Sequence, residues 1–276
     1  MRVADALGLA TQRLNAAGIA GAARDARRIM AAALGVAPDR ITLMSQEPLA
    51  SAAEAVFLDL VNRRAAGHPV SHLVGGRLFC DRWFKVTPDV LDPRPETEGL
   101  VAAALKVPFA DVLDLGTGSG AIILTLLAER PQAVGVAADL SQAALGVAAQ
   151  NARALGVAER VQFVVSDWFD AVGGHYDLIV ANPPYIAADE MAALQPEVRL
   201  HEPRMALTDE ADGLTAYRKI AAAAPAYLRD GGHLMVEIGP TQGGPVARMM
   251  QSTTLSDVRV IPDLDGRDRV VVARKR

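Results

Sequence analysis

The sequence predicts an α/β protein: a mostly parallel, seven-stranded sheet with helices on both faces, preceded by a small helical domain. Three observations lead to this fold class. From about Gly99 onward, short apolar runs typical of strands alternate with longer runs of helical periodicity. The first 70 residues show helical periodicity only. With 276 residues, of which 51% are hydrophobic and 22% charged, the chain is long enough for two domains and a sizeable core.

Residues 1–72 are expected to form a helical bundle. Val3, Leu7, Ala10 and Leu14 fall on one helical face, and the pattern recurs before Gly35. A third helix is expected after Ser51, which has the capping-box spacing to Glu54. Because no catalytic residue types gather in this block, we predict that it recognises a partner. The alternative is a packing appendage.

A β-hairpin within residues 72–94 is expected to join this bundle to a catalytic domain over residues 73–276, with short strands around Leu78-Phe79, Trp83-Phe84 and Val90-Leu91. The seven strands of the sheet are expected at Val112–Leu115, Ala133–Ala138, Val161–Val165, Leu178–Ala181, Leu234–Ile238, Val258–Ile261 and Arg269–Ala273. Helices are expected near residues 119–129, 141–155, 213–229 and 243–252. Since no helix separates the last two strands, one of them should be antiparallel.

A glycine-rich loop, Gly116-Thr117-Gly118-Ser119-Gly120, follows the first of these strands, and a helix begins directly after it. Glycines at this place let the backbone pass close to a ligand at the carboxyl end of the sheet. The spacing G-x-G-x-G differs from the dinucleotide fingerprint G-x-G-x-x-G, and Asp114 just before the loop does not suit a bound pyrophosphate. An acidic residue there can instead meet the ammonium of a methionine group.

Two further candidate ligand-binding residues lie at or just after the ends of the next two strands. Asp139 lies 25 residues after Asp114, where a carboxylate can accept both ribose hydroxyls, and the ring of Trp168 can form a wall for an adenine. Taken singly, Asp139 could be a solvated strand end and Trp168 a core residue. In this order on consecutive strands, they predict an S-adenosylmethionine site and hence a Rossmann-like methyltransferase fold.

The tetrad Asn182-Pro183-Pro184-Tyr185 follows the fourth strand directly. Proline fixes φ near −65° and restrains the residue before it, so the tetrad is a rigid group of acceptors beside an aromatic ring. We predict that Asn182 Oδ1 and the Pro183 carbonyl accept the two hydrogens of a substrate NH2 group and hold its nitrogen in line with the methyl, while Tyr185 stacks on the planar group. The alternative is a proline-rich turn.

The charge, the cysteine and histidine content and the lengths of the apolar runs argue against several classes of protein. The net charge is −4, and because residues 1–70 carry +2, the remainder carries −6, which disfavours direct nucleic-acid binding. Cys80 is the only cysteine, and the five histidines lack ligand spacing, so neither a disulfide nor a metal site is expected. We find no signal-peptide pattern and no apolar run of about 18 residues, so we expect a cytoplasmic protein that does not enter a membrane. A monomer is expected.

Together with these features, several flanking segments resemble the release factor glutamine methyltransferases of the PrmC/HemK type. The segments are residues 86–91, Pro93-Arg94-Pro95-Glu96-Thr97-Glu98, His201-Glu202-Pro203-Arg204, Glu237-Ile238-Gly239 with Gln242, and residues 265–270. The resemblance implies N5-methylation, by S-adenosylmethionine, of the glutamine in the Gly-Gly-Gln motif of class-1 peptide release factors. It implies cofactor contacts from Gly116 to Gly120, Asp139, Trp168 and Asn182, glutamine contacts from the tetrad, and an aromatic, Phe79, over the substrate pocket.

The chain departs from the family pattern in two places. Cys80-Asp81 stands where the family usually has Tyr or Trp and then Gly, and Asp92 stands where it has an apolar residue. Both departures concern the local shape of the pocket edge. Two other classes remain as alternatives: a methyltransferase acting on adenine N6 or guanine N2 of a nucleic acid, and a non-catalytic nucleotide-binding module. The first would need a basic groove, and the second would be expected to lack Asn182 or the glycine loop.

Overall fold

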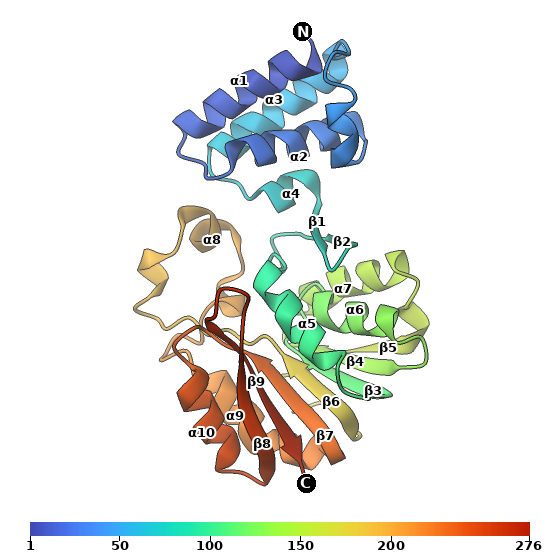
Figure 1. Ribbon diagram of the computed structural model, residues 1–276, viewed down its shortest axis with the longest axis vertical. Coiled ribbons are helices and arrows are strands. Elements are labelled where there is room, and N and C mark those ends of the chain that lie inside the picture. Colours follow the sequence, from blue (N-terminus) through green and yellow to red (C-terminus); the bar gives the residue numbers. More distant parts are fainter. The chain divides into compact units, whose positions relative to one another are not determined.

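The computed structural model describes residues 1–276 and divides into two compact units (Figure 1). The helical unit consists of Met1–Gly76 together with Gln195–His201, and the sheet unit consists of Arg77–Leu194 together with Glu202–Arg276. The boundary between the units falls after Gly76, four residues beyond the predicted position at residue 72, and residues 195–201 group with the helical unit, which was not predicted. None of the helices combines the length and the apolar character that crossing a bilayer requires.

The helical unit packs its helices around a single core. The helices are α1 (Val3–Ala16), α2 (Ala22–Leu34), η1 (Pro38–Thr42), α3 (Ser51–Ala65), α4 (Val70–Val74) and α8 (Pro196–His201). Leu14, Ile29 and Phe57 are fully buried there. The capping box predicted at Ser51 is wrong: α3 begins at Ser51 itself, and its N-cap, Ala50, has extended backbone and no side-chain cap.

A buried ion cluster ties α8 to the rest of the helical unit. Arg64 Nε donates to Asp25 Oδ2 at 2.8 Å, and its Nη1 donates to the His68 carbonyl at 2.9 Å and to Glu197 on α8. The rings of His68 and His201 lie 4.5 Å apart between centroids. Asp25 and Arg64 are both buried, so loss of either partner would leave an uncompensated charge in the core.

The expected hairpin is present as β1 (Gly76–Phe79) and β2 (Arg82–Lys85). Its two turn residues have positive φ, 44° at Cys80 and 60° at Asp81, as tight hairpin turns require. The strand predicted around Val90 is wrong. Val90 instead packs its side chain into a small cluster with Val86 and two residues of helix α7 (Gln142–Ala154).

The seven-stranded sheet has the order β5-β4-β3-β6-β7-β9-β8. Its strands are β3 (Asp111–Leu115), β4 (Val134–Asp139), β5 (Val161–Val165), β6 (Tyr176–Ala181), β7 (Leu228–Glu237), β8 (Leu255–Pro262) and β9 (Asp268–Lys275). All neighbours pair in parallel except β9, which is antiparallel to both β7 and β8. The predicted fold class is therefore confirmed, including the antiparallel strand near the carboxyl end.

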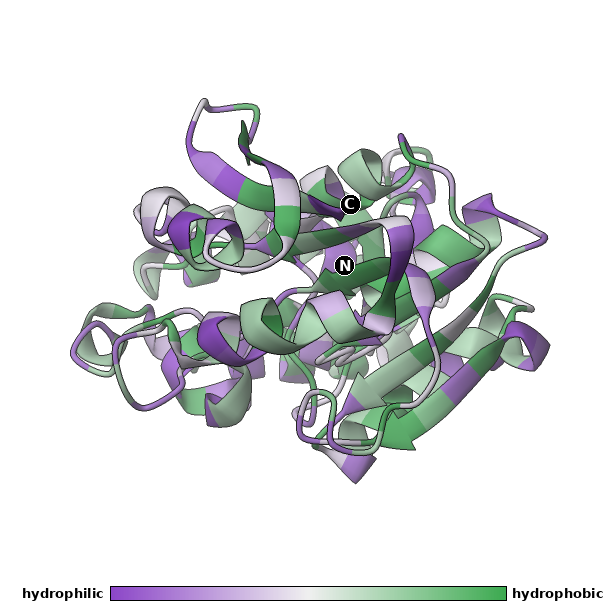
Figure 2. Ribbon diagram, turned by 90° about the horizontal axis from the view of Figure 1, so that it is seen from below, coloured by the Kyte–Doolittle hydropathy of each residue, from purple (hydrophilic) through white to green (hydrophobic).

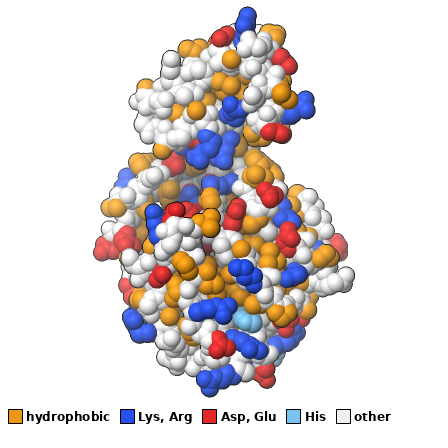
Figure 3. All heavy atoms as spheres, in the orientation of Figure 1, with side chains coloured by type: hydrophobic (Ala, Val, Ile, Leu, Met, Phe, Trp, Pro, Cys, Tyr) orange, Lys and Arg blue, Asp and Glu red, His pale blue; other side chains and the backbone are white.

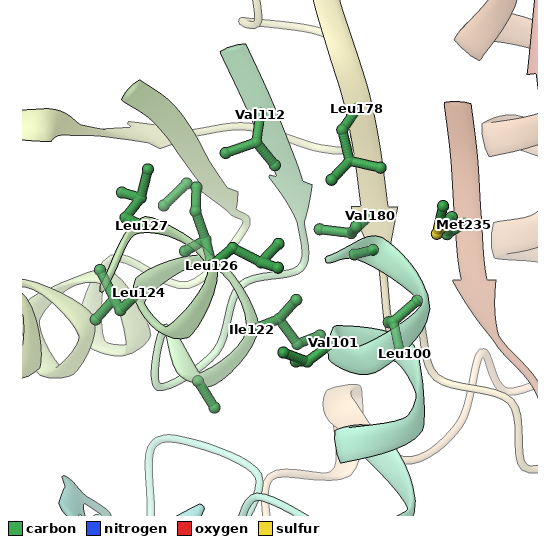
Figure 4. Close-up of a cluster of buried hydrophobic side chains, with 14 of the residues drawn as sticks. Leu100, Val101, Val112, Ile122, Leu124, Leu126, Leu127, Leu178, Val180 and Met235 are labelled. Atoms are coloured by element: carbon green, nitrogen blue, oxygen red, sulfur yellow. The ribbon is translucent and has the colours of Figure 1, made fainter. Parts of the chain in front are cut away.

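Helices cover both faces of this sheet. One face packs against α5 (Glu98–Ala104), α6 (Ala121–Glu129) and α7 (Gln142–Ala154), and the other against α9 (Thr215–Tyr227) and α10 (Gly243–Gln251). Figure 4 shows Leu100 and Val101 of α5 near Val180 of β6 and Ile122 of α6, in the hydrophobic cluster between the sheet and helices α5, α6 and α7. In Figure 2 the strands are mostly hydrophobic in colour, as expected for a sheet that is buried on both faces.

The register of the central strands places the segments that follow β3, β4, β5 and β6 side by side at the carboxyl end of the sheet. Leu115 at the end of β3 pairs with both Ala138 and Ala181, while Asp139 pairs with Val165. The residues that follow these strands therefore leave the sheet side by side. The chain runs from β3 outward to β4 and β5, and then returns to β6 on the other side of β3. Such a switch point is where open α/β sheets bind ligands.

Candidate active site

A pocket of about 480 Å³ lies at the carboxyl end of the central strands, within the sheet unit. Its size is in the range of small-molecule sites. The walls come from residues 89–91, 116–119, 139–141, 166–168 and 203–206, together with Asn182 and Pro184. The glycine loop, Asp139, Trp168 and the tetrad, which lie far apart in the sequence, are therefore brought together at one cavity.

The glycine loop turns tightly at the mouth of β3. Gly116, Gly118 and Gly120 have φ of 72°, 55° and 81°, which L side chains rarely adopt. At Gly120 the positive φ favours glycine, and a Cβ there would also lie 2.7 Å from Leu124 Cδ1 and 3.3 Å from Ala148 Cβ, so a larger residue would have to displace its neighbours. Gly120 is the N-cap of α6 and does not line the pocket; Gly116, Thr117, Gly118 and Ser119 do.

Asp114 is not among the residues that line the pocket, and its contact with a ligand ammonium stays a prediction. It is fully buried in β3 and accepts a hydrogen bond from Thr117 Oγ1 at 2.7 Å, so it holds the loop from behind. Burial raises the pKa of this carboxyl to about 7, because the charged form loses its hydration.

Asp139 lies in the pocket wall at the end of β4. Its Oδ2 accepts from the Gly118 amide and its Oδ1 from the Ser141 amide, both at 2.8 Å. Each carboxylate oxygen can accept a further hydrogen bond, so Asp139 can still bind two hydroxyls of a ligand. Burial raises its pKa, opposed by these backbone hydrogen bonds.

Trp168 adopts an unusual backbone conformation for a bulky residue, with φ of 53°. Ser166 Oγ donates to the Trp168 carbonyl at 2.9 Å and accepts from the Ala171 amide at 3.0 Å, which stabilises the turn. The indole faces the glycine loop: a Cβ on Gly116 would lie 3.8 Å from Trp168 Cζ3. The indole therefore forms a flat wall of the pocket.

Only two members of the tetrad line the pocket, Asn182 and Pro184. Pro183 is buried, and Tyr185 packs partly into the core on the α9 side of the sheet. The Tyr185 carbonyl accepts from Gln242 Nε2 at 2.9 Å, which anchors the end of the tetrad to the segment after β7. A Cβ on Gly213 would lie 2.3 Å from the same carbonyl, so a second segment packs tightly against this turn.

Phe79 lies away from the pocket. It is 1% exposed and packs edge-to-face against Phe84, with 6.0 Å between ring centroids. Because its ring is enclosed in the core, the contact with substrate stays a prediction that this arrangement does not support. The thiol of neighbouring Cys80 has its pKa raised to about 11, chiefly by burial, so it is not a nucleophile at neutral pH.

Two ion pairs brace the segment that precedes α5. Arg94 Nη2 contacts both oxygens of Glu202, at 2.6 and 2.8 Å, which links two segments that are 108 residues apart. Asp92, the departure from the family pattern, pairs with Arg77 Nη1 at 2.7 Å. The charge introduced at Asp92 is thus neutralised within the sheet unit.

Two residues beside Asn182 were named only within the segments that carry the family resemblance, and no role was predicted for either. Thr97 lines the pocket and accepts a hydrogen bond from Asn182 Nδ2 at 3.2 Å. Glu237, at the end of β7, is 1% exposed, and the Thr97 and Asn182 side chains lie close enough to act on its pKa. The signal that could have identified Glu237 is an acidic residue within the otherwise apolar run of residues 234–238.

The strand order, with antiparallel β9 inserted between β7 and β8, and a pocket at the switch point beside β3 are features of a Rossmann-like methyltransferase. Family models agree: one described as a methyltransferase small domain matches residues 96–209, and one described as the PrmC N-terminal domain matches residues 5–75. A 16S rRNA N2 G1207 methyltransferase (RsmC) of T. thermophilus has the same fold, with a TM-score of 0.53 at 19% identity over 73% of this chain and 50% of that one.

Two curated relatives identify the family. The chain is 61% identical to a release factor glutamine methyltransferase of Cereibacter sphaeroides, over 99% of both chains. It is 43% identical to one of Rhodospirillum rubrum, over 96% of this chain and 82% of that one. The chain therefore belongs to the release factor glutamine methyltransferase family.

Proposed function

We propose that this enzyme methylates the side-chain nitrogen N5 of the glutamine in the Gly-Gly-Gln motif of class-1 peptide release factors, with S-adenosylmethionine as the methyl donor. The names of the curated relatives support the substrate, because both are release factor glutamine methyltransferases. The structural observation that carries the proposal is the pairing of Leu115 with Ala181, since it sets Asn182 directly beside the glycine loop.

The pocket residues fit the proposed cofactor. The glycine loop offers close backbone approach, Asp139 has spare acceptor capacity for two ribose hydroxyls, and Trp168 offers a flat wall for adenine. The rRNA methyltransferase with the same fold was solved with AdoMet and guanosine. When bound, S-adenosylmethionine supplies an electrophilic methyl group: the N–C bond forms as the S–C bond breaks, sulfur keeps the electron pair, and the nitrogen releases one proton to solvent.

The role of Asn182 follows from the weakness of the nucleophile. The lone pair of an amide nitrogen is delocalised, and no side chain is basic enough to deprotonate it near neutral pH. Asn182 Oδ1, on a residue that lines the pocket, instead accepts one N–H of the glutamine. The Pro183 carbonyl is proposed to accept the other, which requires the substrate amide to reach past the residues that line the pocket, because Pro183 itself is buried. These acceptors fix the nitrogen in place and stabilise the positive charge that grows on it during transfer.

The charge distribution favours a protein substrate over a nucleic acid. Outside residues 1–70 the chain carries a net charge of −6. Figure 3 shows both basic and acidic side chains on the visible face. A nucleic-acid methyltransferase depends on a basic groove for most of its affinity. The helical unit, with the opposite net charge, is proposed to recognise the release factor.

The test is a methyl-transfer assay with labelled S-adenosylmethionine and, in parallel, an intact release factor, the same factor with alanine in place of the Gly-Gly-Gln glutamine, and duplex DNA or rRNA. We expect label in the intact release factor only, with mass spectrometry locating one methyl group on that glutamine. Label in the nucleic acid, or equal label in the alanine factor, would contradict the proposal.

A further inference from the structure

Asn182 is held by side chains that lie outside its own motif. Its Nδ2 donates to Thr97 Oγ1 at 3.2 Å. The buried Glu237 carboxyl lies close enough to the Thr97 and Asn182 side chains for both of them to act on its pKa. Thr97 belongs to the short helix η2 (Pro95–Thr97), and Glu237 ends β7. Three segments that are distant in the sequence therefore converge on one amide.

These contacts determine which way the amide points. A primary amide has an oxygen that accepts and a nitrogen that donates two hydrogens. Once the nitrogen faces Thr97 and the ionised Glu237, Oδ1 is left to face the pocket. A flipped amide would turn Oδ1 toward the Glu237 carboxylate, so two acceptors would meet in a buried place, which is unfavourable.

Glu237 is costly to the fold. It is 1% exposed, and its Oε2 has no hydrogen-bond partner. A buried carboxyl that is only partly hydrogen-bonded destabilises a protein relative to a neutral side chain of similar shape. Because Glu237 lies beside Asn182, a role in positioning Asn182 would explain why a destabilising carboxyl is present at this place.

We infer that Thr97 and Glu237 are positioning residues for methyl transfer: they fix the Asn182 amide so that its oxygen accepts the N–H of the substrate. This inference rests on the proposed function, because it assigns Oδ1 the substrate nitrogen as its partner. Neither residue is required to touch the cofactor or the reacting atoms.

The protonation state of Glu237 should control this positioning. Only the ionised carboxyl is purely an acceptor; the protonated acid can donate to a flipped Oδ1 and so tolerates the wrong orientation. Burial raises the pKa of Glu237 to about 7. The other charged or titratable groups that act on Glu237 are Arg269 of β9, Glu96 of η2, Tyr185, and Tyr217 of α9.

The first test compares two variants at one position. Thr97→Val keeps the shape but removes the hydroxyl, and Thr97→Ser keeps the hydroxyl. We expect single-turnover methyl transfer to fall about 10- to 100-fold in Thr97→Val, with most of the rate restored in Thr97→Ser and S-adenosylmethionine affinity within about twofold of wild type in both. Thr125→Val is the matched control: Thr125 is equally buried, but its hydroxyl bonds to the Ala121 carbonyl within α6, so transfer should be unchanged. Equal losses in all three variants would contradict the inference.

The second test uses Glu237→Gln. The wild-type transfer rate should decline as the pH falls below about 7, and Glu237→Gln should be slow at pH 8 and should lack this decline. A variant with the wild-type rate and pH profile would overturn the inference.

The third measurement does not depend on activity. In ¹⁵N NMR spectra, the Asn182 side-chain NH2 signals, assigned by their loss in Asn182→Ala, should shift with pH in the wild type and not in Glu237→Gln. If wild-type protein failed to methylate release factor, the proposed function would be wrong. NH2 signals that titrate identically in both proteins would separately refute the role of Glu237.

Discussion

Replacing Asp114 with asparagine should change how the stability of the protein depends on pH. Asp114 is fully buried in β3, and burial raises its pKa to about 7 from an ordinary value near 3.8. Asparagine keeps the shape and an acceptor for the Thr117 hydroxyl, which lies 2.7 Å from Asp114 Oδ2, but cannot ionise.

The sign follows from proton binding. Between pH 3.8 and about 7 the folded state keeps the Asp114 proton while the unfolded state has lost it, so the free energy of unfolding decreases as the pH rises and levels off above about pH 7. A pKa difference of about 3 units corresponds to about 4 kcal/mol in all. Of this, about 3 kcal/mol falls between pH 5 and pH 8.

The assay is chemical denaturation of wild type and Asp114→Asn at pH 5 and pH 8. From pH 5 to pH 8, we expect the free energy of unfolding of the wild type to decrease by about 3 kcal/mol more than that of the variant. The variant therefore becomes more stable relative to the wild type as the pH rises. Asp189→Asn, at an exposed position, is the matched control and should follow the wild type. Parallel behaviour of wild type and Asp114→Asn would refute the assignment of a protonated, buried Asp114.

Three further predictions concern binding and recognition. Asp139→Ala should weaken S-adenosylmethionine binding at least about tenfold in calorimetry, because it removes charge-assisted acceptors worth about 1.5–3 kcal/mol each; unchanged affinity would remove Asp139 from the site. Gly213→Ala should slow methyl transfer more than it weakens cofactor binding, because its Cβ would lie 2.3 Å from the Tyr185 carbonyl and displace the tetrad; a normal transfer rate would show that this packing is unimportant. A chain that begins at Arg77 should bind cofactor but methylate intact release factor far more slowly than the full chain, and equal rates would make the helical unit a packing appendage.

Strands and long helices of the sheet unit could be predicted because their local pattern and their burial agree. The runs around Val112 and Leu178 are continuously apolar, as strands covered on both faces must be. The elements that were missed are short: α5 spans seven residues and α8 six. Such helices are stabilised by packing rather than by their own periodicity, and that packing is not visible in a single segment.

The candidate site could be predicted only where its residues follow strands directly. The glycine loop, Asp139, Trp168 and Asn182 are of this kind, since parallel strands end at a common edge. The burial of Asp114 and Phe79 and the contact of Asn182 with Thr97 depend instead on long-range packing. A separation of 85 residues between Asn182 and Thr97 leaves no local pattern that links them.

Single-turnover transfer with Asn182→Ala at saturating S-adenosylmethionine tests most directly whether the Asn-Pro-Pro-Tyr tetrad holds the substrate nitrogen for methyl transfer. We predict that the transfer rate falls by about 10²–10³-fold, the usual effect of removing one preorganised hydrogen-bonding partner of the transition state. The fold should stay intact by circular dichroism, and mass spectrometry should locate any remaining methyl group on the glutamine side chain. Transfer at the wild-type rate would show that the tetrad is a structural turn and that Asn182 does not hold the substrate nitrogen.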